Sequence, residues 1–229
     1  MIELFFWTTP NGMKPLIMLE ETGLDHTIQL VNISRGEHLS QSFRRISANQ
    51  KIPAIVDHAP LDGNTAIPIF ESGAILQYLA ERSGSLLPQT PSGRAQVLQW
   101  LYWQMAGLGP TLGQFMHFSV YASEPVPYAQ GRFSQEKERL FGVLNGQLAG
   151  RDFIAGDYSI ADVAVYPWIR RLEREGSHLE GHCNLNRWYQ TVSDRPAVKR
   201  AYARADDINT TPSITTASRR FLIGSAAAA

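Results

Sequence analysis

Two neighbouring stretches decide the fold of this chain: KIPAIVD at residues 51–57 and IPIFESGAILQYLAER at residues 67–82. The first predicts a strand that begins at its proline. Residues 67–70 predict a second strand, which an Asp62-Gly63 turn joins to the first. From residue 71 the apolar side chains recur at helical intervals up to residue 82. A strand pair followed by a helix is the expected end of a small α/β domain.

The residues before this unit supply the rest of such a domain. Residues 2–7 predict a buried strand, residues 15–21 a helix that Gly23 stops, and residues 27–31 a second strand. A polar loop then leads into a short helical turn near 40–46. The predicted order is β-α-β-α-β-β-α, which is the thioredoxin-like order with helices packed on a mixed four-stranded sheet.

Strand signals disappear in the second part of the chain. Residues 84–93 are rich in Gly, Ser and Pro and predict a linker, so we expect a thioredoxin-like domain at 1–83 and an all-α domain at 94–205. Residues 206–229, rich in Thr and Ser and ending in four alanines, predict a loosely ordered tail. Helices are predicted at 94–120, 127–148, 160–174, 184–193 and 196–205.

Composition limits the classes of function. The 229 residues carry 21 basic and 21 acidic side chains, so the formal net charge is zero and we expect no nucleic-acid partner. No signal peptide and no membrane span are recognised, so we expect a cytoplasmic protein. The single cysteine, Cys183, excludes an intramolecular disulfide and lies in a stretch that reads as a loop. His178 and His182 are four residues apart, but glycines flank them, so no metal is expected.

Ile52-Pro53 occupies the start of a predicted strand, where a proline needs a special backbone position. With a cis peptide bond, the Ile52 N–H and C=O would be offered to an extended peptide, as an added strand. With a trans bond, the proline would simply begin the strand. The residues alone leave both alternatives open.

Glu71-Ser72 stands where a strand ends and a helix begins. The Ser72 hydroxyl and the unpaired N–H groups of the first helical turn suit a carboxylate, and Glu71 can accept from an ammonium group. The alternative is plain capping of the helix. Combined with the Ile52-Pro53 backbone, this pair describes a receptor for a short zwitterionic peptide.

With these motifs the chain resembles the cytosolic glutathione transferases over residues 1 to 205. The resemblance implies a thioredoxin-like domain joined to a helical domain, a cis-proline that contacts the cysteinyl backbone of glutathione, and a Glu-Ser pair that holds the γ-glutamyl end. It also implies a homodimer. Ser159 and Asp162 form a capping box that resembles the family's helix-capping motif, and we assign it to folding.

Many members of that family place a Tyr, Ser or Cys near the end of the first strand, but this region reads FFWTTPN at residues 5–11. Thr9 and Asn11 are the remaining donors that can favour a thiolate, and the alternative is that they only cap the first helix. The run TPNG at 9–12 and the stretch 49–58 resemble a bacterial subgroup, the nu-class glutathione transferases or disulfide-bond reductases. This resemblance implies that one or two glutathione molecules, or one glutathione disulfide, bind per subunit.

The same resemblance assigns further contacts. Ile52, Pro53, Glu71 and Ser72 would bind glutathione, with Thr9 and Asn11 near its sulfur. Arg132 of the helical domain would reach a glutathione carboxylate. His38 stands where the subgroup commonly has glutamine, and it would contact the glycyl carboxylate with a charge that depends on pH, while Lys51 could replace or supplement it.

We therefore expect a glutathione-dependent disulfide-bond reductase that uses the thiolate of bound glutathione instead of a protein cysteine. Its second substrate would be a small disulfide or an electrophile. Conjugation of glutathione to a small electrophile is the close alternative. A non-catalytic glutathione-binding regulatory protein is the alternative from another class, because a fold does not fix a function.

Overall fold

The computed structural model describes residues 1–63, 65–174, 176, 179–208, 218 and 221. The chain divides into two compact units. The first holds Met1–Ser83 and the residues from Arg200 onward, and the second holds Gly84–Lys199. Within the described residues, no helix combines the length and the apolar character that crossing a membrane requires.

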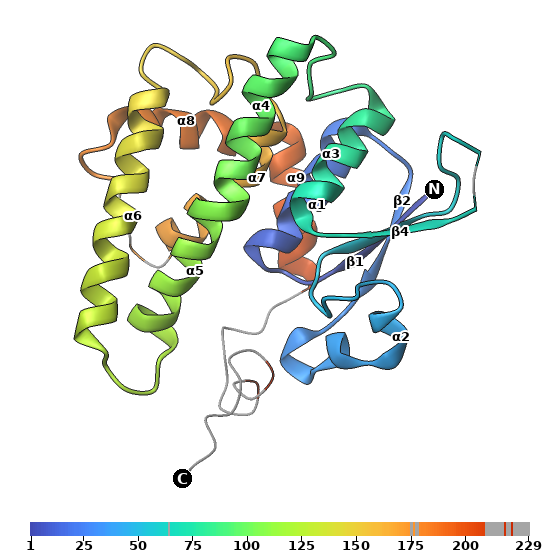
Figure 1. The fold of residues 1–229 in the computed structure, drawn as a ribbon, viewed down its shortest axis with the longest axis horizontal. Helices are drawn as coiled ribbons and strands as arrows, with labels where there is room; N and C mark the ends of the chain where they lie inside the picture. Colours follow the sequence, from blue (N-terminus) through green and yellow to red (C-terminus); the bar gives the residue numbers. More distant parts are fainter. Residues whose placement is uncertain (64, 175, 177–178, 209–217, 219–220, 222–229) are drawn as a thin grey trace. The chain divides into compact units, whose positions relative to one another are not determined.

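The first unit is built on a mixed four-stranded sheet (Figure 1). Its strands are β1 (Ile2–Phe6), β2 (His26–Leu30), β3 (Ala54–Asp57) and β4 (Ile67–Phe70), in the order β2-β1-β3-β4. β1 runs parallel to β2, while β3 runs antiparallel to both β1 and β4. The predicted β-α-β-α-β-β-α order and its mixed sheet are confirmed.

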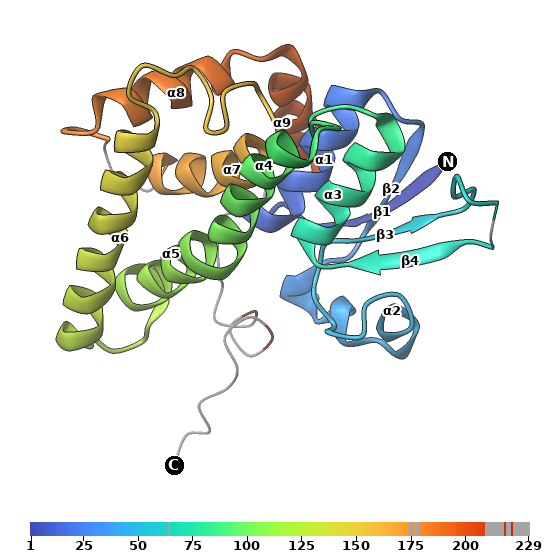
Figure 2. The same ribbon diagram turned by 45° about the horizontal axis from the view of Figure 1, so that its top comes forward.

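Alternation along β1 divides the side chains between the two faces of the sheet. Ile2, Leu4 and Phe6 are buried on one face, while Phe5 points to the other and its ring lies 6.0 Å from that of Phe43. Phe43 belongs to α2 (Gln41–Arg44), which packs there with Val31 and Ala54. The opposite face is covered by α1 (Pro10–Thr22) and α3 (Ser72–Ser83), which pack against each other (Figure 2).

Two short 3₁₀ helices, η1 (Ile33–Arg35) and η2 (Glu37–Leu39), occupy the polar loop before α2. The sequence did not predict them, because three-residue turns carry no apolar periodicity. Gly36 joins them with a φ of +77°, a left-handed conformation that side chains rarely adopt.

The second unit is helical. Its helices are α4 (Pro91–Trp103), α5 (Gly109–Met116), α6 (Pro127–Gln147), α7 (Ile160–Arg174), α8 (Cys183–Ser193) and the first residues of α9 (Pro196–Ile208). α7 is the central helix, buried along most of its length and packed against α4, α5 and α8. α9 ends at Ile208, and all residues beyond it in the predicted tail except 218 and 221 lie outside the described residues.

The predicted helix at 94–120 begins earlier and is not continuous. Its first turn starts at Pro91, because Thr90 Oγ1 accepts a hydrogen bond of 3.3 Å from Gly93 N and a proline in the first turn loses no backbone bond. Two π-helical segments, η3 (Gln104–Leu108) and η4 (His117–Tyr121), interrupt it further on. Apolar periodicity does not distinguish a π-helical turn from an α-helical one.

The capping box at the start of α7 is confirmed and extends into the core. Asp162 is fully buried, and its Oδ2 accepts from Ser159 N at 3.0 Å. Its Oδ1 accepts from Ile154 N at 3.0 Å and from Trp188 Nε1 at 2.8 Å. Burial raises the pKa of the Asp162 carboxyl to about 6, and the hydrogen bonds from Ile154, Trp188 and Ser159 oppose that rise. Asp162 therefore ties the helix start to α8.

Candidate functional site

The strand register gathers three chain segments at one edge of the sheet. Phe5 of β1 lies opposite Ala54 of β3, and Ala54 lies opposite Phe70 of β4. Because β3 runs antiparallel to both neighbours, the loop after β1, the residues before β3 and the residues after β4 meet at this edge. These segments carry Thr9, Ile52-Pro53 and Glu71-Ser72.

Thr9 forms the N-cap of α1. Its Oγ1 accepts a hydrogen bond of 3.0 Å from Gly12 N, so it does cap the helix. A threonine hydroxyl that accepts a bond retains its own hydrogen to donate, so capping and contact with a ligand are compatible. Asn11, in the first turn of α1, is partly exposed like Thr9.

A glycine is required at position 12. A Cβ placed there would collide with the carbonyl oxygen of Trp7, so the chain can turn into α1 this tightly only without a side chain. This close approach holds Thr9 at the start of the helix, with the positive end of the α1 dipole beside it.

The Ile52–Pro53 peptide bond is cis. Lys51 is the residue before Ile52, and its carbonyl oxygen accepts a hydrogen bond of 3.0 Å from Ser47 Oγ. Ser47 lies shortly after α2, so this bond ties the turn to the segment that follows α2. The Lys51 side chain is exposed, and Ile52 is partly buried beside Val31 and Phe43. The backbone that leads into Ile52 is therefore anchored at Lys51.

Glu71 has a φ of +71°, which is uncommon for a residue with a side chain. Its carboxylate is exposed, and Oε1 accepts a hydrogen bond of 3.4 Å from Asn49 Nδ2. Backbone conformations of this kind are costly and cluster at binding sites. Ser72, the next residue, is 4% exposed and begins α3, so its hydroxyl lies beside the first turn of that helix.

Lys14 is the residue of this region that sequence reasoning missed. It lies on α1 and is fully buried, and its Nζ lies 3.3 Å from Ser72 Oγ. Burial lowers the pKa of the Lys14 amine to about 7, although the charge of Glu71 acts to raise it. A lysine in the middle of the otherwise apolar run 13–19 was the available signal.

His38 lies in η2 and is 8% exposed. Its Nδ1 has no hydrogen-bond partner among the described residues. Burial lowers the pKa of its imidazole below the ordinary value. Arg132 belongs to the second unit, on α6, where its Nη1 lies 3.9 Å from Glu136 Oε2. His38 and Arg132 are thus the two proposed ligand contacts outside the sheet-edge segments.

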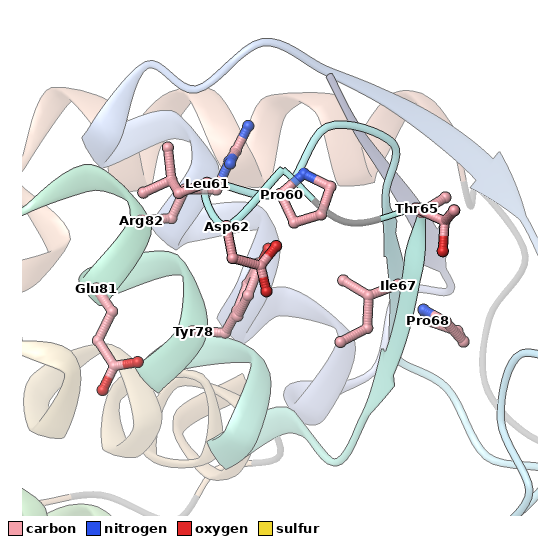
Figure 3. Close-up of a pocket in the computed structure, with 10 residues that line it drawn as sticks. Pro60, Leu61, Asp62, Thr65, Ile67, Pro68, Tyr78, Glu81 and Arg82 are labelled. Carbon is pink, nitrogen blue, oxygen red and sulfur yellow. The ribbon is translucent and has the colours of Figure 1, made fainter.

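A cavity of about 440 Å³ in the first unit lies at the other end of β3 (Figure 3). Two of its lining residues contact Asp57: Tyr78 Oη donates a hydrogen bond of 2.6 Å to the buried Asp57 carboxylate, and Arg82 Nη1 lies 3.1 Å from the same oxygen. Burial and Asp57 raise the pKa of the Tyr78 hydroxyl to about 12. The cavity is lined by Pro60, Leu61, Asp62, Thr65, Ala66, Ile67, Pro68, Tyr78, Glu81 and Arg82, and includes none of the predicted site residues.

Cys183 is exposed and is the first residue of α8, so the loop predicted there is replaced by a helix start. It belongs to the second unit. His178 lies outside the described residues, and His182 Nε2 lies 3.3 Å from Glu138 Oε2. Among the described residues, no three His, Cys, Asp or Glu side chains come together as a metal site.

Comparison with known proteins gives the same picture for both units. Residues 8–82 match the family model of the glutathione S-transferase N-terminal domain, and residues 127–196 match that of the C-terminal domain. The chain is 44% identical over 206 residues to the disulfide-bond oxidoreductase YfcG of Escherichia coli, covering 90% of this chain and 96% of that protein. It is 41% identical to the disulfide-bond oxidoreductase YghU of the same organism, covering 87% and 73%.

Two solved structures are similar over most of the chain. The glutathione transferase of Pseudomonas putida, with one glutathione disulfide bound per subunit, is 42% identical at a TM-score of 0.83, covering 87% of this chain and 90% of that one. The glutathione transferase of Burkholderia graminis, with two glutathione molecules bound per subunit, is 40% identical at a TM-score of 0.86, covering 92% and 89%.

Proposed function

The chain belongs to the glutathione S-transferase family, and from this premise we propose that it is an enzyme that reduces disulfide bonds with glutathione. The observation that carries the proposal is the meeting of Thr9, Ile52-Pro53 and Glu71-Ser72 at one sheet edge. The names of the two Escherichia coli relatives support the choice of reaction.

The sheet edge supplies the contacts for the peptide part of glutathione. The Ile52 backbone pairs with the cysteinyl backbone, as an added strand would. Ser72 and the first N–H groups of α3 hold the γ-glutamyl carboxylate. The exposed Glu71 carboxylate accepts from the γ-glutamyl ammonium, and its bond to Asn49 holds it in place. These contacts therefore suit a ligand that carries an ammonium group and a carboxylate at the same end.

The start of α1 supplies the contacts for sulfur. Thr9 donates its hydroxyl hydrogen and Asn11 its amide hydrogen, and the helix dipole adds to both, so all three favour the thiolate over the thiol. Glutathione supplies the reducing thiols: two of them reduce one disulfide, yielding two product thiols and one glutathione disulfide. In this scheme Cys183, an exposed residue of the second unit, takes no part.

The remaining carboxylate of glutathione, on glycine, is assigned to His38 with Lys51. A buried imidazole whose Nδ1 has no partner among the described residues is a suitable donor. Arg132 is assigned to a carboxylate of the same glutathione or of a second one. The number bound, one disulfide or two thiols per subunit, follows the two solved relatives. The homodimer and the cytoplasmic location stay predictions.

Turnover separates this function from its two alternatives. With glutathione and 2-hydroxyethyl disulfide, coupled to glutathione reductase and NADPH, the purified protein should show steady NADPH consumption. Turnover of an aryl halide without disulfide reduction would replace the proposal with conjugation. Binding of glutathione without either activity would indicate a regulatory protein.

A structure of crystals soaked in glutathione disulfide tests the site itself. We expect ligand density along Ile52, with the γ-glutamyl end at Glu71-Ser72 and the sulfurs near Thr9. Density elsewhere, for example in the cavity beside Tyr78, would contradict the residue assignment and leave the reaction to the turnover assay.

A further inference from the structure

Lys14 is a charged residue type at a fully buried position. No part of it is exposed, and residues 12–19 of α1 are buried around it. A buried ammonium is costly unless hydrogen bonds and opposite charge compensate it, so lysine is rarely kept in such a place. Here Nζ lies 3.3 Å from the hydroxyl of Ser72, at the end of the proposed glutathione site where the γ-glutamyl carboxylate would lie.

The protonation state of Lys14 determines how Ser72 can act. A charged ammonium only donates hydrogen bonds, so it makes Ser72 Oγ the acceptor and leaves the hydroxyl hydrogen for another partner. A neutral amine has a lone pair and can accept that hydrogen instead. Protonated Lys14 therefore turns Ser72 into a donor for an incoming carboxylate, and adds a positive charge behind it.

Without a ligand, the surroundings of Lys14 leave its charged and neutral forms similar in free energy near pH 7. Glu71 raises its affinity for a proton, but burial outweighs it, and the pKa of the amine is about 7. The other charged groups on the elements that pack with α1 have partners of their own. On β1, Glu3 Oε2 lies 3.1 Å from His58 Nε2. On α3, Arg82 Nη1 lies 3.1 Å from Asp57 Oδ2, Tyr78 donates to the same carboxylate, and Glu81 accepts from Gln77. On α1 itself, Glu20 pairs with Arg200 and Arg204.

We propose that Lys14 is a positioning residue, which takes up a proton from the buffer when the γ-glutamyl carboxylate binds, and in its charged form donates to Ser72. This inference rests on the proposed function for the identity of the ligand. The physical reason is reciprocal: a carboxylate beside Ser72 favours the ammonium, and the ammonium favours the carboxylate.

Linkage gives the pH dependence. Well below pH 7 Lys14 is charged with or without ligand, and binding takes up almost no proton. Above that pH the free enzyme must gain a proton to bind, so affinity falls by up to about tenfold for each pH unit. The wild-type enzyme should therefore bind glutathione derivatives more weakly at alkaline pH, although the ligand's carboxylates stay ionised.

Calorimetry counts the proton directly. The probe is S-methylglutathione, because its sulfur carries no ionisable proton. The background is His38→Gln, which removes the titration of His38 and keeps a hydrogen-bond donor. Titrations in two buffers with different ionisation enthalpies should give about 0.5 to 1 proton taken up per ligand near pH 8, and less than about 0.2 near pH 6.

Two substitutions identify the group. Lys14→Met keeps the length of the side chain without a charge, and Lys14→Arg keeps a charge that does not titrate. Neither should take up a proton near pH 8. Lys14→Met should bind at least about tenfold more weakly than its parent near pH 6, whereas the affinity of Lys14→Arg should be independent of pH. Circular dichroism checks that each variant is folded.

If folded Lys14→Met or Lys14→Arg takes up as many protons as the parent, the proposal is wrong. If neither variant folds, the parent still decides: binding near pH 8 without proton uptake overturns it. This failure differs from failure of the proposed function. Binding without proton uptake refutes only the role of Lys14, proton-linked binding without turnover refutes only the reaction, and no binding refutes both.

Discussion

Replacement of Asp162 by alanine tests how the helical unit is held together. The change removes the acceptor of four buried donors: Ile154 N–H, Ser159 N–H, the Ser159 hydroxyl and the Trp188 indole N–H. The Ser159 hydroxyl can rotate to another partner, whereas each of the three orphaned N–H donors costs about 1–3 kcal/mol, so their loss costs about 6 kcal/mol in the middle of the range. Against this, raising the pKa from 3.8 to about 6 costs the ionised carboxyl about 3 kcal/mol, which alanine recovers. We expect a net loss of about 3 kcal/mol near pH 7.

Asp162→Asn is the matched variant. Ile154 and Trp188 both donate to Oδ1, which the asparagine carbonyl oxygen can replace, whereas Ser159 N–H loses its acceptor at Oδ2. The Ser159 hydroxyl, which also donates to Oδ2, can accept from the asparagine amide instead. One lost bond of about 1–3 kcal/mol is then offset by the recovered cost of the charge, so Asp162→Asn should lie within about 2 kcal/mol of the wild type near pH 7.

pH separates the two contributions. Because the folded pKa of Asp162 lies above its unfolded value, the folded state holds more protons between about pH 4 and pH 6. As the pH rises through this window, the free energy of unfolding of the wild type should therefore fall by about 3 kcal/mol relative to that of Asp162→Asn, whose amide does not titrate.

Urea unfolding followed by tryptophan fluorescence and far-UV circular dichroism measures these differences as midpoints at a common slope. Asp157→Ala, at an exposed position in the same loop, should change stability by less than about 0.5 kcal/mol. A loss below about 1 kcal/mol for Asp162→Ala, or a loss for Asp162→Asn as large as that for alanine, would refute the reasoning from individual oxygens.

Three further changes test the site. Thr9→Ala with Asn11→Ala should lower kcat for disulfide reduction at least about tenfold with little change in S-methylglutathione affinity, and unchanged kcat would remove both from the mechanism. Gly12→Ala should destabilise the protein by about 1–3 kcal/mol in thermal unfolding because of Trp7, whereas Gly142→Ala, with open space around it, should not destabilise it. His38 should make glutathione affinity fall about twofold to fivefold as pH rises from about 5 to about 6.5, and His38→Gln should abolish that change; the same pH dependence in the variant would exclude His38.

Much of the first unit follows from the sequence, because alternation and turn residues are local signals. The register that joins Thr9, Ile52 and Glu71 was not readable from any one segment, since it depends on pairing between strands far apart in the chain. The family resemblance implied only that these residues share one site. The capping box at Ser159 was readable, but its bond to Trp188 was not, because that partner lies on another helix.

Lys14 illustrates what single-sequence reasoning misses. An isolated lysine in an apolar helix is usually placed on the solvated face, and only packing between α1 and α3 shows it to be buried against Ser72. The two π-helical segments were missed for a similar reason, since they depend on the packing of the helical unit and not on local propensity.

The most direct test of the central claim is the turnover of Cys183→Ala, which contains no cysteine at all. In the glutathione reductase-coupled assay with 2-hydroxyethyl disulfide, we expect this variant to keep at least about half of the wild-type kcat, because the reacting thiols come from glutathione. A folded variant whose disulfide reduction falls to the uncatalysed rate would contradict the account, since the reaction would then require a protein thiol.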